Sequence, residues 1–253
     1  MIIDSYAAGT VKRRIGTLTR LLRHAGIADP AQITVDHVRA FLARGEFQPW
    51  TIIGYLQDIA AYAEFAGIPD PTATIRRPRE PDGLPDPLTD PAVATLRLEA
   101  GKLADPTLLQ WINLGLFQGF RASDTANIRA ENFDLWADRI RLKGKYDQDD
   151  PLPLAPVVRR SLGCLAHGKG RLYPGVTPPE VSAEVAIFAA KFGIRMRYHQ
   201  LRHTFGTNLY RTTKDLMLTQ RLMRHRAIKN TLKYAKLFDQ DAIDAIRNLP
   251  GAN

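Results

Sequence analysis

The residues best suited to chemistry lie close together near the end of the chain, in the stretch from Tyr198 to Asp239. His199 and Arg202 are three positions apart, so on a helix their side chains share one face and can contact the same anion. His225 and Tyr234 follow on either side of a short connection. Guanidinium and imidazole groups bind anions and a tyrosine hydroxyl can be a nucleophile, so these residue types indicate a site for an anionic substrate.

The same stretch carries most of the positive charge of the chain. It holds nine lysines and arginines and two aspartates, so seven of the nine net positive charges lie within it. Positive charge this concentrated indicates an anionic partner, and DNA is the commonest one. The sequence pI of about 9.8 also favours a nucleic acid over an acidic protein.

Three helical patterns are predicted to position these side chains. Leu201, Phe205 and Leu209 recur at a spacing of four residues, which predicts a buried helix face beside the polar pair. A second helix is predicted from Asp215 to Met223, and another short apolar pattern leads into Tyr234. The imidazole and the tyrosine are therefore expected on either side of a tight turn.

The order and spacing of these motifs resemble the C-terminal signature of the tyrosine recombinases, also called phage integrases. The matching segments are H-Q-L-R-H-T-F-G-T, then D-L-M-L-T-Q-R-L-M-R-H, then T-L-K-Y with its tyrosine nine residues beyond the last histidine. The chain departs from the family at Arg224, where glycine is usual, and at Arg226, where a small polar residue is common. Because glycine tolerates a positive φ better than arginine, the turn around His225 is expected to differ in detail.

An upstream arginine lies at a predicted helix junction. The segment G-F-R-A-S-D-T-A-N-I places Arg121 where a buried helix over 108–120 ends and the next helix begins. Taken alone, Arg121 is equally well explained as a structural partner of Asp124. The resemblance identifies the segment as the first arginine motif of the family, which usually has glutamate at the position of Asp124.

A predicted hairpin supplies a lysine. Residues 139 to 145, R-I-R-L-K-G-K, alternate in polarity as a strand does, and Leu152 and Leu154 lie on a return strand after an acidic turn at 147–150. The hairpin resembles the one that bears the catalytic lysine of the family. Aligned without a gap, Lys145 takes that position, with Lys143 as the alternative; a solvated basic strand is the structural interpretation.

The resemblance implies a mechanism without metal or ATP. The guanidiniums of Arg121 and Arg202 hold the phosphate, and the imidazole of His225 donates a further hydrogen bond to it. The imidazole of His199 assists removal of the tyrosine proton. The tyrosine attacks to give a 3′-phosphotyrosine link, and the lysine protonates the leaving 5′-oxygen. Cationic neighbours are expected to raise the phenolate fraction of the tyrosine. The catalytic set is Arg121, Lys145, His199, Arg202, His225 and Tyr234.

Other chemistries lack their motifs in this sequence. His199 and His203 are four positions apart, but the glutamate of a zinc protease motif is missing. No phosphate-binding loop for nucleotides and no acidic cluster for two metal ions is present, so no cofactor and no metal is expected. The single cysteine, Cys164, lies in an apolar run and is predicted to be a buried, inert thiol.

The first part of the chain predicts a small helical domain with a basic surface. Three or four short helices over 1–75 fit either a protein-interaction module or a DNA clamp, and the repeated arginines favour the clamp. The arrangement resembles the helical, SAM-like core-binding domain of tyrosine recombinases. The predicted DNA-binding residues, including those near the active site, are Arg13, Arg20, Arg23, Arg76, Arg77, Lys143, Arg224 and Arg226.

A proline-rich segment separates the two predicted domains. Seven of the 17 prolines lie between Pro69 and Pro91, so we expect a helical domain over 1–75, a linker over 76–87 and a catalytic domain over 88–253. The predicted fold class is mainly α with a small antiparallel β-sheet. Because the first helix is predicted near residue 10, we do not expect the additional DNA-binding domain that many members of the resembled family carry ahead of this one.

The expected partner is a double-stranded DNA attachment or recombination site, bound by a homotetramer. An accessory or directionality protein is a further candidate partner. An amphipathic helix predicted after Tyr234 folds back on its own domain or, as the resemblance suggests, docks into a neighbouring subunit. No signal peptide or membrane span is found, so a cytoplasmic, DNA-associated protein is expected. The rival functions are a type IB topoisomerase and a non-catalytic DNA-binding protein on the same fold.

Overall fold

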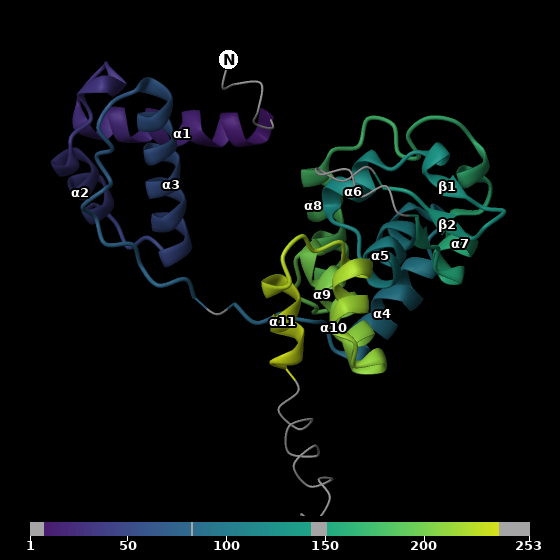
Figure 1. Ribbon diagram of the computed structural model, residues 1–253. Coiled ribbons are helices and arrows are strands. Elements are labelled where there is room, and N and C mark those ends of the chain that lie inside the picture. Colours follow the sequence, from purple (N-terminus) through teal and green to yellow (C-terminus); the bar gives the residue numbers. More distant parts are fainter. Residues whose placement is uncertain (1–7, 82, 143–150, 238–253) are drawn as a thin grey trace, which may run out of the picture. The chain divides into compact units, whose positions relative to one another are not determined.

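The computed structural model describes residues 8–81, 83–142 and 151–237. The chain divides into two compact units, Met1–Asp82 and Gly83–Asn253, each with its own hydrophobic core (Figure 1). Lys143, Lys145, the acidic turn of the hairpin and the predicted helix beyond residue 237 lie outside the described residues. No helix in the described ranges is long and apolar enough to cross a membrane.

The first unit is a small bundle of helices. It contains α1 (Ala8–Ala25), a 3₁₀ turn (Pro30–Gln32), α2 (Val35–Ala43) and α3 (Pro49–Ala66). Thr34 caps α2 by accepting a hydrogen bond from the backbone N–H of His37 at 3.3 Å. One apolar face of each helix is buried against the other two, as the helical periodicity predicts. The buried core comprises Leu21, Ile33, Val38, Phe41, Leu56 and Ile59.

The second unit is mostly helical with one small sheet, which confirms the predicted fold class. Its helices are α4 (Asp90–Gly101), α5 (Thr107–Gln118), α6 (Ala122–Asn127), α7 (Pro156–Leu162), α8 (Pro178–Ala190), α9 (Tyr198–Thr213), α10 (Leu216–Met223) and α11 (Lys229–Ala235), with 3₁₀ turns at Ala130–Asn132 and Gly163–His167. The antiparallel sheet has the order β1 (Phe133–Asp134), β2 (Arg139–Ile140), β3 (Leu152–Pro153).

The sheet register aligns one apolar column, in which Ile140 and Leu152 are buried and Phe133 is half-buried. Ile140 pairs with Phe133 on one side and with Leu152 on the other. Within the described residues β2 ends at Ile140, so this strand is shorter there than the alternation over 139–145 predicts. The strand β1 was not predicted, because two residues are too few to show an alternating pattern.

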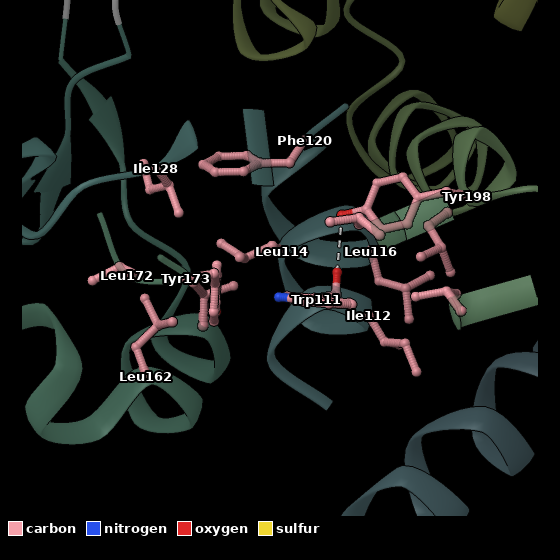
Figure 2. Close-up of a cluster of buried hydrophobic side chains, with 14 of the residues drawn as sticks. Trp111, Ile112, Leu114, Leu116, Phe120, Ile128, Leu162, Leu172, Tyr173 and Tyr198 are labelled. Atoms are coloured by element: carbon pink, nitrogen blue, oxygen red, sulfur yellow. Dashed lines mark hydrogen bonds between the residues drawn. The ribbon is translucent and has the colours of Figure 1, made fainter. Parts of the chain in front are cut away.

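The helix α5 contacts α4, α6, α7, α8 and α9, and several of its side chains belong to the buried cluster drawn in Figure 2. Trp111, Ile112, Leu114 and Leu116 on this helix are all buried, as the apolar run over 108–120 predicts. The Tyr198 hydroxyl donates a hydrogen bond to the Trp111 carbonyl at 3.0 Å, and this bond is drawn in Figure 2. It fixes the first residue of α9 against α5, directly ahead of His199.

The close approach of α9 to the end of α5 depends on glycine. A Cβ atom on Gly115 would lie 2.7 Å from the Cβ atom of Leu201. Leu201 is buried, but Phe205 and Leu209 are only half-buried, so the buried face predicted for this helix is narrower than its spacing suggests. Phe205 instead packs beside Gly119, where α5 ends.

We expect Gly119→Ala to destabilise the second unit by about 2–4 kcal/mol, because two costs add. Gly119 has a φ of +63°, which L-residues adopt poorly, and an added Cβ atom would lie 2.5 Å from Cδ1 of Phe205. Thermal denaturation measures the change, with Gly175→Ala as the control, since Gly175 has a φ of +80° but no neighbour within 4 Å of an added Cβ. Equal losses in the two variants would contradict the predicted clash.

Candidate active site

The site is built around Arg202, one of the largest fully buried side chains of the described chain. Its two terminal nitrogens donate hydrogen bonds to the carbonyls of Gly119 and Met223. Both carbonyls lie at helix C-termini, at the ends of α5 and α10, where the helix dipole favours a cation. Arg202 thereby holds together three helices, α5, α9 and α10. Burial, aided by Arg121 and Arg224, lowers the pKa of Arg202 to about 9, so the side chain remains charged at neutral pH.

Arg121 lies immediately before α6, beside the end of α5. Its backbone N–H donates to Asp124 Oδ2 at 2.9 Å, and its Nη1 lies 3.9 Å from the same oxygen. Its side chain is 43% exposed, so its guanidinium can still reach a ligand. Burial, opposed by Asp124, lowers the pKa of Arg121 from its ordinary value. The structural partnership with Asp124 therefore exists, and it leaves the catalytic interpretation open.

Arg224 adopts the left-handed backbone conformation that glycine would favour. Its φ is +53° and its ψ is 46°, so the turn after α10 keeps this conformation although arginine replaces glycine. Such a residue costs about 1–2 kcal/mol. The side chain offsets that cost with a 2.8 Å hydrogen bond from its Nη2 to Asp124 Oδ2, and its guanidinium lies 5.5 Å from the centroid of the Phe120 ring.

His225 lies flat against Tyr234. The two rings are 6.1 Å apart at their centroids with an interplanar angle of 14°, and the imidazole Nδ1 lies 2.9 Å from Thr231 Oγ1. Burial, together with Arg202 and Arg121, lowers the pKa of His225 to about 3. The imidazole is thus neutral at neutral pH and can donate a hydrogen bond from one nitrogen only.

Tyr234, on α11, is 2% exposed. Burial raises the pKa of its hydroxyl to about 12, although Arg202 and Arg121 act in the opposite direction. The sequence indicated the cationic neighbours, but the desolvation of the hydroxyl outweighs them here. The hydroxyl is therefore protonated at neutral pH, and its attack on any centre requires a proton acceptor.

His203 is a site residue that the sequence interpretation did not include. Its Nδ1 lies 3.4 Å from the Tyr234 hydroxyl oxygen, and its ring meets that of His199 edge-on with centroids 4.5 Å apart. Part of His199 is exposed to solvent, and the desolvation of the rest of the residue, together with His203 and Arg202, lowers its pKa to about 4. The spacing of four residues between the histidines was apparent, but it was considered only for zinc. In the described part of the chain, no group of three histidine, cysteine, aspartate or glutamate residues could hold a metal ion.

Five of the six predicted catalytic residues belong to the second unit and interact there. The pKa of His225 responds to Arg202, Arg121 and His199, and that of Tyr234 responds to both arginines. The sixth, Lys145, lies outside the described residues.

The arginines predicted to contact DNA are mostly at the surface. In the first unit Arg13 Nη2 pairs with the buried Asp58 at 2.8 Å, and Arg20 Nε donates to the Gly16 carbonyl at 2.9 Å. In the second unit Arg224 differs, since its side chain is only 15% exposed and is directed to Asp124. The others of this set that are described, all exposed, are Arg23, Arg76, Arg77 and Arg226.

Comparison with known proteins identifies similar sequences. The sequence model of the phage integrase family matches residues 179–241, a segment that includes His199, Arg202, His225 and Tyr234. The tyrosine recombinase XerC of Chromohalobacter salexigens is 26% identical over 269 residues, covering 96% of this chain and 88% of the relative. The tyrosine recombinase XerA of Pyrococcus horikoshii is 24% identical over 205 residues, covering 76% of this chain and 70% of the relative.

Two solved structures of integrases have folds similar to that of this chain. The integrase from mycobacterium phage Brujita is 27% identical with a TM-score of 0.52, covering 98% of this chain and 89% of that one. The Tn1549 transposon integrase, solved in complex with transposon right end DNA, has a TM-score of 0.72 at 15% identity, covering 97% of this chain and 95% of that one. The second likeness concerns the fold alone.

Proposed function

Because this chain belongs to the tyrosine recombinase family, we propose that it is a site-specific DNA recombinase or integrase that cuts and rejoins strands through a 3′-phosphotyrosine link. The observation that carries the proposal is that two guanidiniums, of Arg121 and Arg202, and two imidazoles, of His203 and His225, lie around the buried Tyr234. A phosphodiester under attack gathers negative charge on its non-bridging oxygens, and fixed cationic donors stabilise that charge.

Each side chain has one role in the proposed reaction. Arg121 and Arg202 hold the non-bridging oxygens, and His225 donates a further hydrogen bond to them. The oxygen of Tyr234 bonds to phosphorus as the bond from phosphorus to the 5′-oxygen breaks. Lys145 protonates the leaving 5′-oxygen. The energy of the phosphodiester is retained in the new link, so the 5′-hydroxyl of a second strand can reverse the step without ATP.

Accessibility sets one requirement on this mechanism. The side chains of Tyr234 and Arg202 are 2% and 1% exposed and cannot meet a DNA phosphate as they stand, so the groups that cover them must move aside when DNA docks. Tyr234 begins the last described turn of the chain, and the residues that follow it are those predicted to form the helix that contacts a neighbouring subunit. We therefore propose that assembly on DNA, as a homotetramer on two duplexes, is coupled to exposure of the nucleophile.

The DNA is proposed to contact both units. Arg13, Arg20, Arg23, Arg76 and Arg77 in the first unit, and Arg226 in the second, are exposed basic side chains suited to phosphate contacts. Several similar proteins were solved with DNA, among them XerH bound to difH substrate and a lambda integrase dimer bound to a COC′ core site. These complexes support a duplex attachment site as the partner, with any accessory protein still to be identified.

The function is tested by capturing the covalent link. Purified protein is incubated with a pool of nicked duplexes with randomised arms, in which cleavage releases a short strand and traps the adduct. We expect adducts that survive denaturation, that form in EDTA because arginines supply the charge, and whose DNA defines a preferred site. Failure to trap any adduct would contradict the proposal. Strand exchange between two captured duplexes then separates a recombinase from an enzyme that only relaxes supercoils.

A further inference from the structure

We propose that His203, rather than His199, accepts the proton of Tyr234 when the tyrosine attacks. This inference rests on the proposed function, since it assigns a further catalytic residue to the same reaction. The contact that supports it joins His203 on α9 to Tyr234 on α11.

The geometry favours His203 over the other two imidazoles. Within the described residues, its Nδ1 is the ring nitrogen that lies within hydrogen-bond distance of the Tyr234 hydroxyl, at 3.4 Å. Catalytic hydrogen bonds are often this long before substrate binds. His225 stacks parallel to the tyrosine ring and its Nδ1 is engaged by Thr231, while His199 meets His203 rather than the tyrosine. His225 and His199 are thereby left for the phosphate.

The surroundings of His203 keep it ready to accept a proton. The charged and titratable groups that face it are His199 and Arg202 on its own helix, Lys233 and Tyr234 on α11, and Asp86 ahead of α4. Burial, Arg202 and Lys233 lower its pKa below the ordinary value for histidine, and Asp86 acts in the opposite direction. The imidazole of His203 is neutral at neutral pH. Once the imidazole has accepted a proton, the negative charge of Asp86 stabilises the resulting imidazolium.

The neighbouring imidazole reinforces this division of roles. Because His199 and His203 are 4.5 Å apart at their ring centroids, a positive charge on one disfavours a positive charge on the other. His199 therefore stays neutral while His203 holds the tyrosine proton. A neutral His199 can still donate one hydrogen bond to a phosphate oxygen.

The proton also has a route for exchange with solvent. His203 and His199 line a cavity of about 510 Å³, together with Asp86, Arg195 and Arg197. Gln200 fixes Asp86 at its edge with a 2.8 Å hydrogen bond from Nε2 to Oδ2. Of the two histidines, His203 is the one that contacts both the buried hydroxyl and this cavity.

The step balances in atoms and charge. The O–H bond of Tyr234 breaks and its proton moves to Nδ1 of His203, while the tyrosine oxygen bonds to phosphorus. The bond from phosphorus to the 5′-oxygen breaks, and that oxygen keeps the electron pair and takes a proton from the proposed acid, Lys145. In the reverse step His203 returns its proton to the tyrosine oxygen.

Nuclear magnetic resonance tests the resting contact without DNA. An Nδ1 that accepts from the tyrosine requires the ring proton on Nε2, so long-range ¹H–¹⁵N spectra should identify the Nε2–H tautomer of His203. Tyr234→Phe should shift the Nδ1 resonance of His203 and leave that of His24, in the first unit, unchanged. A His203 ring that carries its proton on Nδ1 would overturn the assignment.

Single-turnover cleavage of a duplex captured from the randomised pool tests the reacting state. His203→Ala should slow adduct formation on the order of 10²-fold, with unchanged DNA affinity, and imidazole in the buffer should restore part of the rate. The wild-type cleavage rate should rise with pH as His203 loses its proton, and we call this rise the acidic limb of the pH profile. The acidic limb should be absent in His203→Ala. His203→Gln, which keeps a polar side chain of similar length, provides a second test if His203→Ala unfolds.

His199→Ala is the matched control, because it removes the adjacent imidazole from the same helix face. It should keep the acidic limb and show no rescue by imidazole. If His199→Ala loses the limb and is rescued while His203→Ala is not, His199 is the acceptor and our inference fails. A wild-type protein that forms no adduct overturns the proposed function itself, whereas a wild-type adduct rate in both His203 variants overturns the inference alone.

Discussion

Replacing Tyr234 with phenylalanine is expected to abolish the covalent protein–DNA adduct while DNA affinity stays unchanged. The substitution removes one oxygen and keeps the ring, which fills a buried space next to Gly206 and Met223. Among the described residues the hydroxyl makes one long contact, to His203 at 3.4 Å, so its loss should change the free energy of unfolding by no more than about 1 kcal/mol. The nucleophile disappears and the fold remains.

Two measurements on one preparation check this expectation. Denaturing gels of the nicked-duplex reaction report the adduct, and a mobility shift with the same duplex reports affinity. Tyr210→Phe serves as the control, because Tyr210 is another half-buried tyrosine of the second unit, on α9. An adduct that persists in Tyr234→Phe and disappears in Tyr210→Phe would move the nucleophile to Tyr210.

The helices that carry the site were predictable because their apolar spacing is local. The run over 108–120 predicts a buried helix and α5 is one, and the stretch from 215 to 223 predicts α10 within one residue of its bounds. The fold class followed from the same patterns, since helical periodicity covers most of both units. The spacing of His199 and Arg202 also predicted that both lie on one helix, and both lie on α9.

The partners of the site residues were not predictable, because they are made by backbone atoms and by burial. Arg202 donates to the carbonyls of Gly119 and Met223, which have no side-chain signature and lie 83 and 21 positions away. The proximity of His203 to Tyr234 depends on how α11 packs against α9. The pKa of Tyr234 is set first by desolvation, which depends on the packing of the folded chain.

At Arg224 the sequence predicted one part of the structure, the backbone strain, and missed another, the hydrogen bond that compensates for it. The sequence indicated a residue unsuited to a left-handed turn, and the strain exists, since its φ is +53°. What the sequence did not reveal is the compensation, a hydrogen bond to Asp124 on a helix 100 positions away. Asp124 thus joins Arg121 to Arg224, and two positions where the chain departs from the motifs that it resembles are in contact with each other.

Replacing Arg202 with lysine is expected to reduce both stability and cleavage. One ammonium cannot reach two carbonyls on different helices as the guanidinium does, so one of these buried groups loses its donor. We expect a loss of about 2–4 kcal/mol in the free energy of unfolding. We also expect single-turnover cleavage to fall by on the order of 10³-fold, because bidentate binding of the phosphate is lost.

Two matched variants separate the structural part of this effect from the chemical part. Arg211→Lys, on the same helix, alters an exposed ion pair at 3.9 Å from Asp90, so stability and cleavage should both change little. Arg121→Lys alters a guanidinium whose side chain is 43% exposed, so it should slow cleavage on the order of 10²-fold or more with a melting temperature near that of the wild type. Thermal denaturation and adduct formation are measured for all three.

If Arg202→Lys melts and cleaves like Arg211→Lys, then the buried guanidinium neither joins the helices nor holds the phosphate. If it loses stability but cleaves at the wild-type rate, its role is structural and Arg121 alone binds the phosphate oxygens.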